Sequence, residues 1–109
     1  MKLSNLRENT KPVRLIIAGE VLNITVVPHR LTSELIDQYK DASDERDYDG
    51  MAAAFSEFVQ DWDIVEDEGG DILPINGDTF RQLPLAVLNR IWDEVVNAVA
   101  PKSRKKSGN

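Results

Sequence analysis

The chain has 109 residues, of which 19 are acidic and 13 are Lys or Arg, a formal net charge of −6 and no cysteine. A chain of this length folds as one domain and buries roughly two thirds of its unfolded surface. The composition excludes disulfides, thiolate nucleophiles and cysteine-ligated metal sites, and no apolar stretch approaches the roughly 20 residues of a membrane-spanning helix. The N-terminus carries a Lys but no apolar run, so we expect no secretory signal and a cytosolic location.

The charges are unevenly distributed. Residues 34–71 hold fourteen carboxylates against only Lys40 and Arg46, whereas residues 102–109 hold four positive charges and no negative one. An acidic body repels the phosphates of nucleic acid and also repels other copies of itself. We therefore expect a basic or mixed-charge protein partner, with no nucleic-acid and no membrane partner. A disordered basic tail over residues 101–109 is favoured over a weak, salt-sensitive nucleic-acid contact.

A β-hairpin is predicted after a flexible polar arm over residues 1–11. Residues 13–18 and 21–27 are rich in β-branched side chains and flank Gly19-Glu20, a pair that suits a type II′ turn. That turn sets Ala18 opposite Val21. In this register one face is entirely apolar, and it comprises Val13, Leu15, Ile17, Leu22, Ile24 and Val26. Because a two-stranded hairpin is only marginally stable, other elements must cover this face.

Two helices are predicted next. The first spans about residues 33–43, with Thr32 as its N-cap and a hydrophobic staple between Leu31 and Ile36. The second spans about residues 48–62. Its apolar seam has helical spacing and comprises Met51, Phe55, Phe58, Val59 and Trp62.

A short hairpin and a last helix complete the predicted fold. Ile64-Val65 and Ile72-Leu73 flank an acidic Gly-Gly turn, and Asp78 is a candidate cap for one helical turn over residues 79–82. Pro84 suits the first position of a helix that runs to Val99 and packs against the second helix. The predicted fold is therefore α+β: one domain over residues 12–100, with an N-terminal β-hairpin packed against a small bundle of about three α-helices.

The candidate catalytic and metal-binding groups do not form a recognisable site. The acidic turn, residues 66–71, fits no EF-hand frame, because the required Gly and the bidentate Glu fall at the wrong positions. A solvated turn is the favoured interpretation, with weak binding of a divalent ion left open. His29 is the single histidine, and neither a nucleophile pattern nor a phosphate-binding loop accompanies it. We expect no enzyme, no cofactor and no metal.

Three stretches together resemble the small tail assembly chaperones of tailed bacteriophages, of the siphophage type and in their short form. They are the hairpin running through residues 22–32, the segment from Phe55 through Trp62-Asp63-Ile64 into the acidic turn, and Leu73-Pro74-Ile75 followed by Leu83-Pro84-Leu85. The likeness spans roughly residues 12–100. It rests on the order of the segments and on their pattern of residue types, because the family has no invariant motif.

The resemblance implies a non-enzymatic protein of the host cytoplasm that is absent from the mature virion. It would bind the tape measure protein, and the tail tube protein as a further partner, while the tail is assembled. Many members of that family are made in two lengths by a programmed ribosomal frameshift, and the amino-acid sequence leaves open whether this chain has a longer form. The alternative is a small structural tail or connector protein of the virion. Candidate partner-binding residues are Phe55, Trp62, Leu88, Trp92 and Val95, which the sequence leaves open between core and an uncovered face used for a partner or for self-association.

Overall fold

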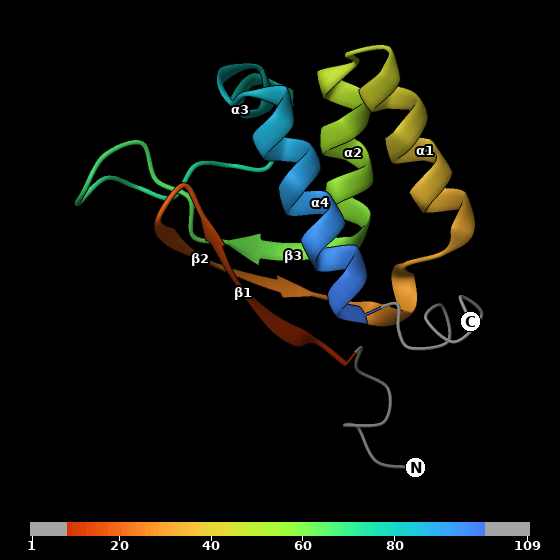
Figure 1. Ribbon diagram of the computed structural model, residues 1–109, viewed down its shortest axis with the longest axis horizontal. Coiled ribbons are helices and arrows are strands. Elements are labelled where there is room, and N and C mark those ends of the chain that lie inside the picture. The colour runs from red at the N-terminus through yellow and green to blue at the C-terminus, as the bar shows by residue number, and fades with distance from the viewer. Residues whose placement is uncertain (1–8, 100–109) are drawn as a thin grey trace.

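The computed structural model describes residues 9–99 and has a three-stranded antiparallel sheet with helices gathered on one side (Figure 1). The strand order is β1 (Lys11–Ile17), β2 (Glu20–Val26) and β3 (Val59–Trp62). The predicted α+β class, with an N-terminal hairpin and a helical bundle, is confirmed. Most of the predicted N-terminal arm and the whole predicted basic tail lie outside the described residues, and Lys11 already belongs to β1.

The hairpin has the predicted inner face but not the predicted register. Leu15 pairs with Leu22 and Ile17 with Glu20, so the two turn residues are Ala18 and Gly19. Both have positive φ, 53° and 82°, as in a type I′ turn whose twist matches that of the strands. The prediction of a type II′ turn at Gly19-Glu20 was therefore wrong. The register differs by two residues, which preserves the alternation of faces, and the apolar face points into the core.

Two helices and a short 3₁₀ turn follow the hairpin. The turn η2 (Pro28–Arg30) leads to α1 (Ser33–Asp44), where the Thr32 hydroxyl accepts a hydrogen bond from the Leu35 N–H at 3.1 Å. That contact is the predicted N-cap. The helix α2 (Tyr48–Phe58) begins after Asp47, whose carboxylate accepts from the Gly50 N–H at 3.0 Å.

The second helix is shorter than predicted, because residues 59–62 form β3 instead of its last turn. β3 pairs with β2, with Ile24 opposite Trp62 and Val26 opposite Val59, and a bulge interrupts the register between these pairs. The bulge reverses the usual alternation of sides, so Val59 and Trp62 are both buried although they are three residues apart. A spacing that reads as helical is thus satisfied by an irregular strand.

Two helices complete the chain. Asn76, and not the predicted Asp78, caps α3 (Gly77–Gln82), with its side-chain oxygen accepting from the Thr79 N–H at 3.0 Å. Pro84 immediately precedes α4 (Leu85–Val99), and its carbonyl accepts the N–H of Leu88 at 3.1 Å. Figure 1 shows α4 lying over the sheet beside α2.

One aromatic ring connects the elements of the core. Phe55 of α2 is fully buried, and its ring centroid lies 5.6 Å from Tyr39 of α1, 6.2 Å from Trp62 of β3, 4.9 Å from Phe80 of α3 and 5.3 Å from Trp92 of α4. The contact with Trp92 is the predicted packing of the last helix on the second. These edge and tilted contacts lie within the range in which aromatic pairs attract one another.

Candidate functional site

The five predicted partner-binding residues all lie in the core. Phe55, Trp62, Leu88, Trp92 and Val95 are buried in one cluster with the inner face of the hairpin. The sequence left these residues open between core and groove, and the structure places them in the core. Trp62 also lines a surface groove described below, whereas Phe55, Leu88 and Val95 are fully buried. The accessible apolar surface is formed by other residues.

Four large apolar side chains are exposed among the described residues, and they lie on the hairpin and beside the acidic turn. Ile16 is 61% exposed and its cross-strand partner Val21 is 47% exposed, while Val65 and Ile72 are 37% and 59% exposed. The first pair lies on the outer face of the hairpin. The second pair forms an isolated β-bridge on either side of the acidic turn.

Residues 64–73 form a projecting ribbon that we call the acidic arm (Figure 1). The Leu73 N–H donates to the Ile64 carbonyl at 2.8 Å, which closes the predicted short hairpin. Its tip turns at Gly69, which has a φ of 78°. Trp62 fastens the base of the arm to β3, because its indole Nε1–H donates to the Leu73 carbonyl at 2.8 Å.

A groove of about 290 Å³, which we call the hairpin groove, lies between the hairpin tip, the acidic arm and the start of α4. Its walls are mainly apolar, and it is lined by Ile17, Ala18, Glu20, Val21, Leu22, Asp63, Ile64, Val65, Leu83, Pro84, Val87 and Ile91. The volume is just below the range of about 300–1,000 Å³ for small-molecule sites. It therefore suits one or two side chains of a partner better than a large cofactor.

The charged groups of the hairpin groove are negative. Glu20 and Asp63 are the ionisable residues that line it, and the four carboxylates of the arm lie beyond them. Asp63 is fixed in place, because its carboxylate oxygens accept from the backbone N–H and the side-chain Nδ2 of Asn23, each at 2.9 Å. An apolar groove with a fixed negative rim favours a partner that combines apolar and basic side chains.

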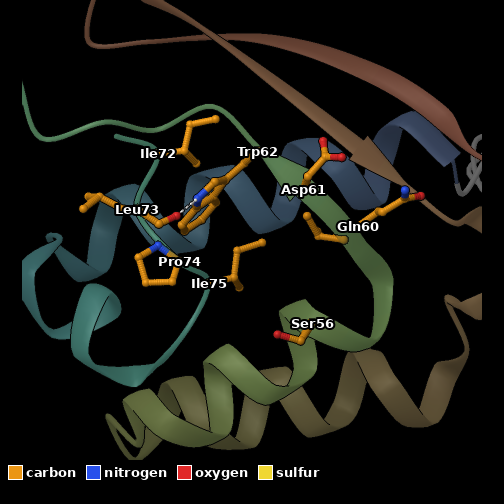
Figure 2. A pocket seen from close by; sticks show the side chains of 9 residues that line it. Ser56, Gln60, Asp61, Trp62, Ile72, Leu73, Pro74 and Ile75 are labelled. Atoms are coloured by element: carbon orange, nitrogen blue, oxygen red, sulfur yellow. Dashed lines mark hydrogen bonds between the residues drawn. The ribbon is translucent and has the colours of Figure 1, made fainter. Parts of the chain in front are cut away.

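A second groove, which we call the β3 groove, is lined by the returning strand of the arm (Figure 2). It measures about 330 Å³ and is lined by Ser56, all four residues of β3, and Ile72, Leu73, Pro74 and Ile75. Figure 2 shows Gln60 and Asp61 on the strand side, and Ile72, Leu73, Pro74 and Ile75 opposite them. The acidic arm is thus a wall shared by both grooves.

Within residues 9–99, no group of three His, Cys, Asp or Glu side chains is placed to hold a metal ion. Burial, with a smaller contribution from the Asp93 charge, raises the pKa of Tyr39, whose hydroxyl donates to Asn89 Oδ1 at 2.8 Å. This tyrosine stacks on Trp92 and belongs to the core.

No helix of the described part of the chain is long and apolar enough to cross a bilayer.

Comparison of the chain with models of protein families, with characterised proteins and with solved structures gave no match. The surface itself therefore carries the functional argument.

Part of that surface had a signal in the sequence. Ile64-Val65 and Ile72-Leu73 were predicted to pair across the acidic turn. Ile16 and Val21 sit on the mixed outer face of the hairpin, where an apolar residue has no core to fill. The β3 groove had no signal, because β3 itself was predicted as helix.

Proposed function

We propose that this chain is a non-enzymatic assembly chaperone that binds the tape measure protein of a tailed bacteriophage and keeps it available while the tail tube assembles. The observation that supports the proposal is the hairpin groove, an open apolar concavity on an otherwise acidic domain. The identity of the partner comes from the resemblance described above. The groove supplies a physical means of holding an apolar segment.

The shape of the hairpin groove suits an amphipathic helix. Helices that dock in apolar grooves insert a few side chains spaced three or four residues apart, while their polar side remains in water. Val21, Val65 and Val87 would contact those apolar side chains, and Glu20 would face Lys or Arg residues on the partner. The net charge of −6 keeps chaperone molecules apart and keeps the complex soluble.

The test is co-expression of the chain with the tape measure protein of the same phage, followed by pull-down and light scattering. We expect the long protein to be soluble and to co-elute only in the presence of the chain. Val21→Asp and Val65→Asp place a charge in the hairpin groove and should abolish this effect. Ile16→Asp is the matched control, because Ile16 is at least as exposed, pairs with Val21 and does not line the groove.

Each failure has a distinct meaning. If the tape measure protein precipitates with the native chain, the chaperone proposal is refuted. If it remains soluble with both groove variants, another surface holds it. Mass spectrometry of purified particles tests the alternative, because a structural connector would be present there at a fixed stoichiometry and a chaperone would be absent.

A further inference from the structure

The two edges of the sheet are protected unequally. On the β1 edge, Pro12 lacks a backbone N–H, and Arg90 of α4 donates to the Ile16 carbonyl at 3.2 Å. Lys11 on the same strand donates to the Ala98 carbonyl at 2.9 Å, so α4 is held along this edge. Proline, charged side chains and a covering helix are the usual means by which proteins prevent the pairing of an edge strand.

The opposite edge has the β3 groove beside it. All four residues of Val59–Trp62 line that groove. On the other side β3 pairs with β2, and in an antiparallel ladder alternate residues direct their N–H and C=O groups outward. Residues 72–75 form the far wall, and Figure 2 shows them separated from β3 with the Trp62 indole reaching across to Leu73.

We infer that the β3 groove is a strand-addition site, which takes an extended partner segment with alternating apolar side chains flanked by Lys or Arg. In strand addition, backbone hydrogen bonds to the edge supply affinity and adjacent pockets select alternate side chains. Here the edge is β3, and the pocket is formed by Val59, Trp62, Ile72 and Ile75. This site is separate from the hairpin groove, and the inference does not require the partner to be a tape measure protein.

Charge identifies the occupant. Asp61 lines the groove and Asp71 immediately precedes Ile72 of its far wall, so basic flanking residues are attracted. A second copy would bring its own acidic region of fourteen carboxylates in residues 34–71 towards this rim. The chain's own residues 102–109 are basic, but they contain no apolar side chain to fill the pocket. An external segment that is both apolar and basic fits better than either.

The test uses the full chain, labelled with ¹⁵N, and the synthetic peptide Lys-Val-Thr-Val-Thr-Val-Lys as the probe. We expect saturable binding by calorimetry, with amide shifts concentrated at Val59–Trp62 and at residues 72, 73 and 75. A peptide with the same sequence and N-methyl groups on alternate amides cannot donate to the edge. It should bind roughly tenfold more weakly or worse, as expected for the loss of one or two hydrogen bonds.

Variants of the chain separate this site from a general apolar effect. Ile72→Ser should weaken binding of the peptide by at least fivefold, whereas Ile16→Ser should leave it unchanged. These two isoleucines are almost equally exposed, at 59% and 61%, and Ile16 lies outside the groove. Asp61→Asn should reduce affinity most at low salt, because screening weakens an exposed charge interaction.

Several outcomes would overturn the inference. Equal affinity of the N-methylated peptide would show that no strand is added, and equal loss in Ile72→Ser and Ile16→Ser would show non-specific contact. Concentration-dependent shifts at β3 without peptide would identify a second copy as the occupant. Shifts of the amides of residues 102–106 on peptide addition would identify the chain's own tail. If only the peptide experiment fails, the chaperone proposal stands on the hairpin groove.

Discussion

Replacing Trp62 by Phe should loosen the acidic arm more than it loosens the rest of the domain. The indole is buried, and its Nε1–H donates to the Leu73 carbonyl at 2.8 Å, which is the side-chain bond that fastens the arm to β3. Loss of that hydrogen bond costs about 1 kcal/mol. The smaller phenylalanine ring also loses packing contacts, which lowers the free energy of unfolding by about 1–2 kcal/mol more. This is a part of the roughly 3–5 kcal/mol lost when a buried aromatic side chain is truncated to alanine. The global loss is then about 2–3 kcal/mol.

Trp92→Phe is the matched control, because Trp92 is also a buried tryptophan but its ring contacts are with Tyr39, Phe55 and Phe58. Trp92→Phe should lower the free energy of unfolding only by the loss of packing contacts, about 1–2 kcal/mol. Urea unfolding followed by circular dichroism measures both values. The two variants should differ by roughly the value of one hydrogen bond.

Hydrogen exchange tests the local effect directly. The Leu73 N–H donates to the Ile64 carbonyl at 2.8 Å and reports opening of the arm. In Trp62→Phe this amide should exchange about fivefold faster than in the native chain. The lost hydrogen bond is worth about 1 kcal/mol, and about 1.4 kcal/mol corresponds to a tenfold change in the opening equilibrium. In Trp92→Phe it should be almost unchanged. Acceleration by the same factor in both variants would refute the assignment of Trp62 as the fastening of the arm.

Two further predictions concern the fold. Burial and the charge of Asp93 raise the pKa of Tyr39 above its usual value of about 10. The contribution of protonated Tyr39 to stability is therefore complete below pH 10. It declines as the pH rises further, because the unfolded chain loses the tyrosine proton first. Tyr39→Phe should lower the free energy of unfolding by about 1 kcal/mol near pH 7. In urea titrations the difference in unfolding free energy between the native chain and the variant should narrow between pH 10 and 11. A constant difference would contradict the pKa shift. Ala18→Gly should stabilise the domain by roughly 0.5–1 kcal/mol, because Ala18 has a φ of 53° and a left-handed backbone favours glycine. The control Ala53→Gly, at an exposed helical position, should instead destabilise it by about 1 kcal/mol in the same thermal melts, and a loss at both positions would disprove the argument from the turn.

The sequence was sufficient for the class of fold because alternation and helical spacing are local signals. The inner face of the hairpin followed from the alternation of Val13, Leu15, Leu22 and Ile24, whichever turn type closed it. The turn itself did not follow, because Ala18 adopts positive φ, a conformation uncommon for alanine. That conformation is compatible with the twist of the two strands, which is a property of the assembled hairpin.

The strand β3 could not be predicted because its pairing partner is distant in the sequence. Val59 and Trp62 continue the helical spacing of Phe55 and Phe58, and only the bulged pairing with Val26 and Ile24 buries them in a strand. The β3 groove could not be predicted for a related reason. Apolar periodicity identifies residues that the core will take, such as Leu88 and Trp92, whereas grooves consist of residues that the core leaves uncovered.

The acidic arm contributes one wall to each of the two grooves. Ile64 and Val65 line the hairpin groove, whereas Ile72 and Leu73, which pair with them across the arm, line the β3 groove. A ligand that displaces this ribbon from one side changes the shape of the cavity on the other. Thermodynamic reciprocity then requires each ligand to alter the affinity of the other by the same factor. If both proposed sites bind a ligand, the Val65–Ile72 bridge and the Leu73–Ile64 hydrogen bond are the contacts through which one binding event would favour or oppose the other.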